Sequence, residues 1–553
     1  MKITLIPIFL ALFTGAEYVS AIGEKSQLTR DDRVKIQLFT DRSLYTVGEE
    51  IFFSASLLIE DFAESVIYVE LITPEGDKIR NGKFKSERGI ASGCLFIPED
   101  LLTGLYYIRA YTREMRNKGP AFYDYVPVKV INPSKNDILV SGKESSGPVS
   151  YMKPDTGFLR FSNLKPKYNR RDSVIFFIDF TKSQDKQISN VCITVVPENS
   201  LTTNEFIARD EEGHDSPVIF YPEPRGISLT GTLLNKDQKT PAADHIVSLS
   251  VLGAKDFSAT KTDQKGRFFF TLPDDHGKKD IFLSPEDFSG SGMSLLIDND
   301  YCSLPVTLPS PEFILSQEEK KTTLSLAVNA RICREFAGSV EAADTATGQR
   351  RPFYGQPTST IIMDKFIDLP TLKEYFGEIS QEVKVRERKG KSYFKFFGGA
   401  AGMIINDPLV LVDWVVINDI NRVLAVSPQK ILMIETVNKP YIKGDLTYGG
   451  IISIISREGD FAGIDLPASG IFVKYDFFSP VCAGITAVKQ SRIPDARNTL
   501  LWLPEINSSD NHIKRVSFIT GDTSGRYVIV VRGVYSDGRV FGQSVGFEVT
   551  VGQ

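Results

Sequence analysis

Residues that could carry catalysis or bind a metal are few in this chain, and their spacing matches no known chemistry. A zinc site needs histidine, cysteine or carboxylate ligands at a characteristic close spacing, as in HExxH. The four histidines stand in no such motif; they are His214, His245, His276 and His512. The GxSxG turn of a serine nucleophile and the GxxxxGK[ST] phosphate loop are also absent, since the glycine-rich residues 398–402 lack the Lys-Ser/Thr ending. We therefore predict no enzymatic activity, no metal and no cofactor.

Carboxylates leave one catalytic alternative open. Adjacent pairs such as Asp274 and Asp275 lie in hydrophilic turns, which favours solvated side chains. Carboxylates that are distant in the sequence could still meet in the fold as a general acid and base. A hydrolase with such a site is therefore kept as an alternative.

The cysteines give no recognisable framework. They are five, an odd number, and contain no CxxC pair, which favours buried free thiols, although an exported chain could oxidise them. They are Cys94, Cys192, Cys302, Cys333 and Cys482.

The first 21 residues have the pattern of a secretory signal peptide. Lys2 supplies a positive start, residues 3–13 are an apolar run, and Val19-Ser20-Ala21 is a small-residue cleavage site. We expect cleavage after Ala21 and a mature chain in the periplasm, at the outer membrane or on the cell surface. An N-terminal membrane anchor is the alternative, but the run is short for a span. No later run of about 20 apolar residues occurs, so we expect no span in the mature chain.

Composition favours a string of β-rich modules. The chain has 553 residues, enough for roughly three to five domains. The 42 glycines and 29 prolines supply many turns, and 37 Phe with 20 Tyr suit half-buried strands. The formal net charge is -5, so we expect neither nucleic acid nor an anionic membrane as a partner.

Residues 30–135 have the pattern of a β-sandwich, with strands at intervals of about 10–15 residues. An early turn reads Thr40-Asp41-Arg42-Ser43-Leu44-Tyr45 followed by Gly48-Glu49, and late strands read Leu102-Thr103-Gly104-Leu105-Tyr106 and Ile108-Arg109-Ala110-Tyr111. On these motifs the module resembles the MG2 domain of the macroglobulin family. We expect Tyr45 and Tyr106 to pack between two sheets. The family's protease-trapping thioester, Cys-Gly-Glu-Gln, surrounds none of the cysteines, so that mechanism is not expected.

Three further modules also read as sandwiches. Residues 150–222 predict a second macroglobulin-like β-sandwich, and residues 465–553 predict a C-terminal one with a turn at 523–527. Residues 224–305 resemble a carboxypeptidase-regulatory-like domain, on Gly231 after the opening strand and the hairpin TDQKGRF at 262–268. In that family this sandwich accompanies the peptidase and is not itself the peptidase.

The segment before residue 405 combines a helix and a hairpin. Leu324, Val328 and Ile332 follow helical spacing and predict an amphipathic helix. Residues 383–390 and 393–397 predict a hairpin, whose basic run we interpret as a solvated turn.

Residues 360–460 carry the most specific motif. An apolar strand ends at Asp413, Ile434 and Glu435 follow on a second strand, and a glycine-bracketed turn leads into the strand IISIIS. This stretch resembles the plug domain of TonB-dependent outer-membrane receptors. Trp414 stands where that family has glycine, and a bulky residue there should require the local turn to be rebuilt. The motif positions, structural or partner-binding, are Asp413, Trp414, Glu435, Gly444, Tyr448, Gly449 and Gly450.

The plug-like stretch is not followed by enough sequence for a receptor barrel. Only 94 residues follow Gly459. A barrel of 22 strands, each of about 9 residues or more, needs roughly 200 residues before any loop is counted. We therefore expect no pore, and the absence of a TonB box argues against energised transport.

These observations predict a mostly β chain, a string of macroglobulin-like or Ig-like β-sandwich domains with one α+β TonB plug-like domain. The function we expect is a non-catalytic cell-envelope scaffold or binding protein that acts through protein–protein contacts, with an outer-membrane barrel or a periplasmic protein as partner. An accessory component of a TonB-dependent nutrient-uptake receptor is the alternative, and a purely structural linker is another.

Overall fold

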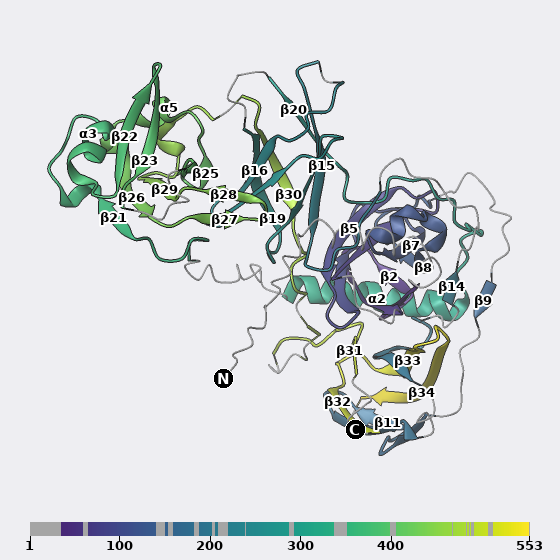
Figure 1. Cartoon of the computed structure of the whole chain (residues 1–553). Helices are drawn as coiled ribbons and strands as arrows, with labels where there is room; N and C mark the ends of the chain where they lie inside the picture. Colours follow the sequence, from purple (N-terminus) through teal and green to yellow (C-terminus); the bar gives the residue numbers. More distant parts are fainter. Residues whose placement is uncertain are drawn as a thin grey trace, which may run out of the picture.

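The computed structural model describes residues 35–58, 65–139, 150–152, 159–181, 187–201, 205–207, 219–237, 239–286, 292–336, 351–398 and 405–551, the last range without 467, 483, 486, 488–491 and 507–511. The predicted signal peptide lies outside these residues. The described chain is mostly β, as predicted. Figure 1 shows two sandwiches and one long helix at one end, a third sandwich in the middle, and a domain of sheet and short helices at the other end.

The N-terminal sandwich corresponds to the first predicted module. One sheet has the order β1-β3-β6, and the other has the order β5-β4-β7-β8-β14-β9 with β2 on β8. Tyr45 and Tyr106 are 0% and 1% exposed, which confirms that both are packed in the core. The strands are β1 (Lys35–Thr40), β2 (Leu44–Thr46), β3 (Glu50–Leu58), β4 (Val66–Ile72), β5 (Lys78–Lys85), β6 (Ile90–Phe96), β7 (Gly104–Tyr111), β8 (Asp124–Ile131), β9 (Ser150–Met152) and β14 (Glu205–Ile207).

The second and the C-terminal predicted sandwiches are one sandwich, so the prediction of two domains at 150–222 and 465–553 is wrong. Its sheets have the orders β10-β12-β32 and β11-β34-β33-β13-β31. Each range alone supplies too few strands for two sheets, and β13 forms a nine-residue ladder with β33 that joins the ranges. We call this unit the composite sandwich. Its strands are β10 (Arg160–Ser162), β11 (Lys167–Asn169), β12 (Ser173–Asp179), β13 (Ile188–Pro197), β31 (Leu501–Leu503), β32 (Ile513–Ile519), β33 (Gly525–Tyr535) and β34 (Val540–Thr550).

The middle sandwich contains the third predicted module and one strand from later in the chain. Its sheets have the orders β18-β15-β20 and β17-β16-β19-β30. Strand β30, which we expected in the last module, instead pairs with β19 over six residues. The strands are β15 (Ser228–Leu234), β16 (Ile246–Val251), β17 (Asp256–Lys261), β18 (Arg267–Thr271), β19 (Lys278–Pro285), β20 (Ser294–Ile297) and β30 (Ile471–Asp476).

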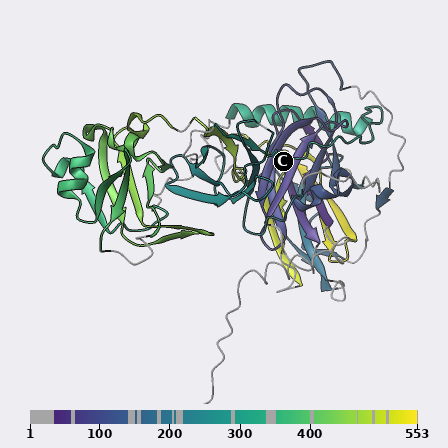
Figure 2. The same cartoon turned by 45° about the horizontal axis from the view of Figure 1, so that its top comes forward.

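Helix α2 (Gln317–Phe336) confirms the predicted helix but presents the opposite face to the protein. Leu324 and Val328 are 70% and 59% exposed, whereas Leu326 is fully buried. The buried face is polar in part, because Asn329 hydrogen-bonds Asn498 of the composite sandwich. In Figure 1 the helix lies between the N-terminal and composite sandwiches, and Figure 2 shows it crossing the same end of the molecule from another direction.

The distal domain corresponds to the plug-like region. Its mixed sheet has the order β21-β26-β29-β24-β25, with β24 parallel to β29, and two hairpins stand beside it. Helix α3 starts at a capping box of Thr371 and Glu374. The strands are β21 (Ser359–Ile362), β22 (Val383–Arg388), β23 (Lys391–Phe396), β24 (Leu409–Val412), β25 (Val415–Val416), β26 (Ile431–Val437), β27 (Tyr441–Lys443), β28 (Leu446–Tyr448) and β29 (Ile451–Ser456). The helical segments are η4 (Met363–Lys365), α3 (Leu372–Glu374), η5 (Tyr375–Ile379), α5 (Ile420–Leu424), η6 (Pro428–Lys430) and η7 (Phe461–Gly463).

A disulfide bond joins Cys94 on β6 to Cys482, 388 residues later. The preference for free thiols is therefore wrong for this pair, because the fold brings two distant segments together that the sequence could not place. The other three cysteines are in no disulfide bond, and two of them, Cys192 and Cys302, are buried.

We predict that this bond stabilises the molecule. Replacing Cys94 and Cys482 with serine should lower the free energy of unfolding by about 2–4 kcal/mol, because the cross-link restricts the unfolded chain. Urea unfolding with and without reductant measures the effect, and Cys333→Ser is the control without it. Titration of five thiols rather than three in the unreduced, denatured chain would contradict the bond.

Candidate functional site

The predicted plug-motif residues gather in two places on the distal domain. Asp413 and Trp414 form the turn between β24 and β25, and Glu435 lies on β26 of the same sheet, with β29 between. Gly444 is at the turn of the β27–β28 hairpin, and Tyr448 ends β28. Gly449 and Gly450 then connect that hairpin to β29.

The turn at Asp413 and Trp414 keeps the backbone conformation that glycine favours. Asp413 has φ of 45° and Trp414 has φ of 72°, both in the left-handed region, as in a two-residue hairpin turn. The Asp413 carboxylate fixes the turn by accepting hydrogen bonds from the Ser456 N–H at 2.8 Å, the Ser456 hydroxyl at 2.6 Å and the Phe461 N–H at 2.8 Å. Trp414 therefore occupies a left-handed turn of the kind that glycine favours, and a difference from the turn of a receptor plug stays a prediction.

Trp414 is packed against the middle sandwich. Its ring is 7% exposed and stacks on Tyr354 with ring centroids 5.8 Å apart. The Tyr354 hydroxyl donates to Glu435 Oε2 at 2.5 Å, so Glu435 belongs to the same group. From the middle sandwich, the Ser250 hydroxyl donates to the Trp414 carbonyl at 2.8 Å, and Lys255 Nζ lies 6.0 Å from the indole centroid.

Tyr448 contributes to the same contact between domains. It is 9% exposed and lies in a small apolar core with Phe257 of β17 and with Leu409 and Ile451 of the distal sheet. Gly450 has φ of 112°, and a Cβ there would lie 2.6 Å from Phe396 and 2.9 Å from the Val437 carbonyl oxygen. The glycine therefore allows β28 to turn tightly into β29.

Three of the seven plug-motif residues thus form part of a joint inside this chain. We call it the distal joint; it comprises Ser250, Lys255, Phe257, Tyr354, Trp414, Glu435 and Tyr448. Gly444 is outside it, at an exposed turn where a Cβ would meet no atom within 4 Å. Tyr354 was missed in the sequence, because only the fold places it beside Trp414.

One carboxyl group beside the distal joint titrates in an unusual range. Burial raises the pKa of Glu286, which follows β19, to about 7, and the nearby Asp407 carboxylate of the distal domain adds to the rise. The charge of Glu286 also acts on Tyr448, whose pKa is raised mainly by its own burial. The ionised form of Glu286 is therefore unfavourable while the distal domain packs against the middle sandwich.

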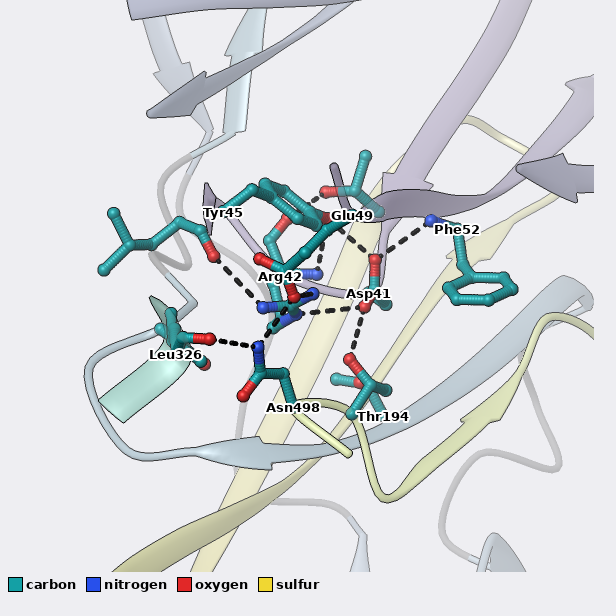
Figure 3. Close-up of polar contacts among 12 residues, drawn as sticks. Asp41, Arg42, Tyr45, Glu49, Phe52, Thr194, Leu326 and Asn498 are labelled. Carbon is teal, nitrogen blue, oxygen red and sulfur yellow. Dashed lines mark hydrogen bonds and ion pairs between the residues drawn. The ribbon is translucent and has the colours of Figure 1, made fainter. Parts of the chain in front are cut away.

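A buried network of charges lies at the other end of the molecule, in the turn that contains Asp41, Arg42 and Glu49 (Figure 3). Arg42 Nη2 donates to Glu49 Oε1 at 2.9 Å, and Arg42 Nε donates to Asp41 Oδ2 at 3.2 Å. The Tyr45 hydroxyl donates to Asp41 Oδ1 at 2.7 Å. Burial alone would lower the pKa of Arg42, but Glu49 and Asp41 outweigh it and hold that pKa above its ordinary value. The guanidinium therefore stays charged in the interior.

This network, which we call the charged hub, joins three parts of the chain. From the composite sandwich, the Thr499 hydroxyl donates to Asp41 Oδ2 at 2.6 Å. The Asn498 amide donates to Glu49 Oε1 at 2.7 Å and to the Leu326 carbonyl of α2 at 3.0 Å. Figure 3 shows Asp41 and Asn498 converging with Arg42 from different ribbons. The sequence motif identified Asp41 and Glu49, but nothing in it pointed to their partners some 450 residues later.

A second buried cluster joins the N-terminal and middle sandwiches. Lys83 Nζ lies 2.5 Å from Asp300 Oδ2, and Arg113 Nη1 lies 3.8 Å from Asp300 Oδ1. The Tyr68 hydroxyl donates to Glu223 Oε2 at 2.8 Å. Burial raises the pKa of Glu223, although Arg113 and the hydrogen bond from Tyr68 favour the carboxylate. These groups pair with one another across the domain boundary, although Asp300 Oδ1 accepts no hydrogen bond among the described residues.

Neither cluster is arranged like a metal centre. Among the described residues, no group of three or more histidine, cysteine, aspartate or glutamate side chains could hold a metal ion. In the same residues, no helix is long and apolar enough to cross a membrane.

We predict that the charged hub is essential for stability. Arg42→Met should cost about 3–5 kcal/mol, because it leaves the Asp41 and Glu49 carboxylates buried without their cation. Arg88→Met is the matched control: Arg88 pairs with Glu505 across the same boundary, but its side chain is 73% exposed, and its loss should cost at most about 1 kcal/mol. Urea unfolding measures both, and equal costs would contradict the assignment.

We also predict a pH dependence from Glu286. Its pKa is raised from 4.5 in the unfolded chain to about 7, so its contribution to stability is complete below pH 4.5 and is lost as the pH rises through 7. The loss should approach about 3 kcal/mol. Glu286→Gln should remove this slope in unfolding measured between pH 5 and 8, whereas Asp445→Asn at an exposed turn should keep it. An unchanged slope in Glu286→Gln would contradict the prediction.

Comparison with known proteins gives distant structural neighbours alone. No family model matches the chain, and no curated protein matches its sequence. Escherichia coli alpha-2-macroglobulin activated by porcine elastase matches at 11% identity and a TM-score of 0.22, over 94% of this chain and 44% of that one. Salmonella alpha-2-macroglobulin reacted with methylamine matches at 9% identity and the same TM-score, over 94% and 39%. The chain spans less than half the length of these proteins, and scores this low do not establish a shared arrangement of domains.

Proposed function

We propose that the chain is a non-catalytic scaffold or binding protein of the cell envelope, which carries its distal domain as a contact module for another envelope protein. Its first module resembles a macroglobulin MG2 domain, its middle sandwich a carboxypeptidase-regulatory-like domain, and its distal domain a TonB receptor plug. The observation that carries the proposal is the place of two clusters of buried charged groups, both of which lie at boundaries between domains.

Groups held in this way are suited to rigidity rather than to chemistry. The Arg42 side chain is 3% exposed and Asp41 is fully buried, so a substrate could not reach either without separating the domains. A catalytic site instead needs titratable groups that converge on an accessible hollow. The buried clusters therefore favour a rigid arrangement of the sandwiches, which holds the distal domain away from the N-terminal and composite sandwiches.

The position of the distal domain supports a role in contact with a partner. Figures 1 and 2 both show it at one end of the molecule, reached through the middle sandwich. Apolar side chains are exposed on its surface, with Ile367 78% and Ile442 67% exposed. Isolated exposed residues are common, but two on a domain at the end of a rigid support supply natural anchor points for a partner.

The accessory role in nutrient uptake is the alternative, and the distal joint bears on it. In that role the plug-motif residues would have to contact a receptor. Trp414 and Tyr448 are instead packed against the middle sandwich, so a receptor would have to displace an internal contact. We therefore favour a scaffold that uses the other surfaces of the distal domain.

Site-specific crosslinking in the native envelope tests the proposal. A photo-crosslinking amino acid at Ile367 or Ile442 should give a discrete adduct with one protein, identified by mass spectrometry. The control position is Lys239, in an exposed loop of the middle sandwich, and it should give none. Adducts from no position on the distal domain would overturn the proposal, and an adduct with a TonB-dependent receptor would favour the accessory role.

A further inference from the structure

The hairpin of β22 and β23 has two chemically different faces. Its register pairs Lys384 with Lys395, Arg386 with Tyr393, and Arg388 with Lys391. Alternate rungs of an antiparallel pair point to the same side, so these six side chains share one face. We call it the cationic face.

The opposite face of the hairpin packs on the distal domain. Val383, Phe394 and Phe396 are at most 6% exposed and belong to the main core of that domain. The hairpin's single acidic residue, Glu387, is also on this side, where it pairs with Lys373 Nζ at 2.6 Å. The cationic face is therefore fixed outward by the core, and the hairpin's own carboxylate does not neutralise it.

The cationic face has an unbalanced charge. Five of its six side chains are basic, and two of its three rungs place like charges directly opposite each other, which is unfavourable in a sheet. Within the described residues, no ion pair joins Arg386, Arg388 or Lys391 to a carboxylate. Lys389 at the turn adds a further exposed cation. An arrangement of this kind is stabilised by an anionic partner.

Aromatic side chains and a shallow hollow adjoin these charges. Tyr393 is 38% exposed in the centre of the cationic face, and Phe397, just after β23, is 42% exposed. The Arg386 guanidinium carbon lies 5.4 Å from the Phe397 ring centroid. A hollow of about 420 Å³ beside β22 is lined by Lys373, Lys384, Arg386 and Phe397, among others. Its size and charge suit one anionic headgroup.

These features fit a lipid surface better than a protein. Protein interfaces are depleted of lysine and of charge at their centre. Anionic membranes instead attract clustered Lys and Arg, and tyrosine and other aromatic rings settle at the headgroup level. In Figure 1, β22 and β23 lie in the half of the distal domain away from the middle sandwich, beside α3.

We propose that the cationic face binds the phosphate-bearing headgroups of an anionic phospholipid membrane, and that it lays the distal domain on that membrane. This goes beyond the scaffold function and can fail separately, because the crosslinking positions Ile367 and Ile442 are outside the cationic face. It also revises the expectation, drawn from the net charge, that the chain has no anionic-membrane footprint.

Cosedimentation of the full chain with vesicles tests the inference. The chain should bind vesicles of phosphatidylglycerol and phosphatidylcholine, should not bind phosphatidylcholine alone, and should be released by high salt. Arg388→Ala should lower the partition coefficient about fivefold. The combined variant Arg386→Glu, Arg388→Glu and Lys391→Glu should abolish binding.

A matched control separates the cationic face from overall charge. Lys236→Glu, Lys239→Glu and Lys265→Glu, all at exposed positions of the middle sandwich, change the net charge equally and should leave binding intact. Circular dichroism confirms that each variant folds. Tyr393→Trp adds a reporter whose emission should shift to the blue on anionic vesicles, as tryptophan enters the headgroup region.

Three results would overturn the inference. Absence of binding to anionic vesicles would mean that the cations only protect the hairpin edges from pairing with other strands. Equal loss in the control variant would mean that binding follows net charge. Binding of poly-glutamate or of inorganic phosphate, without binding of vesicles, would assign the face to an acidic protein or to a soluble anion.

Discussion

The ion pair between Arg42 and Glu49, with Asp41 beside it, is the interaction on which the arrangement of domains depends. A buried guanidinium costs several kcal/mol in lost hydration unless carboxylates and hydrogen bonds surround it. The N-terminal sandwich supplies the two carboxylates, but their remaining oxygen lone pairs are satisfied by Thr499 and Asn498 of the composite sandwich. Separating the domains would therefore expose a network that is complete only when they are together. Neutral contacts extend the same boundary, since the Asn190 amide donates to the hydroxyls of Ser54 and Ser56 at 2.9 Å.

The distal joint is held by a different balance of forces. A left-handed backbone costs roughly 1–2 kcal/mol for a residue other than glycine. Burial of an indole removes about 150–250 Å² from water, worth roughly 4–6 kcal/mol at about 25 cal/mol per Å². Burial of Trp414 between Tyr354 and the middle sandwich therefore outweighs the strain of its turn. Glycine could form the turn without strain but could not form the contact, which explains why a bulky residue is compatible with this position.

Local pattern allowed the separate strands and turns to be predicted, because each depends on neighbours in the sequence. Alternation predicted the hairpin of β22 and β23, and the Asp-Arg-x-x-Tyr spacing identified the turn at Asp41. Pairings between distant segments could not be predicted. The nine-residue ladder of β13 with β33 could not be read from the sequence of either strand. A strand that pairs with a neighbour in its own module has the same alternation of residues as one that pairs with a segment far along the chain. For the same reason Cys94 and Cys482 gave no sign of their bond. The orientation of α2 was mispredicted because a joint made of hydrogen bonds, such as Asn329 to Asn498, has no hydrophobic stripe.

The net charge shows how a sum over the chain can conceal a local property. A total of -5 is a sound argument about the field far from the molecule. At physiological ionic strength, however, charges are screened beyond about 8 Å, so a surface that touches the distal domain senses only the side chains next to it. On the cationic face these are five basic groups within three rungs of one hairpin. The 69 acidic groups that make the total negative are spread along the whole chain. A chain that is acidic overall can therefore present a strongly basic contact at its far end, provided that its core fixes which face of a hairpin points outward.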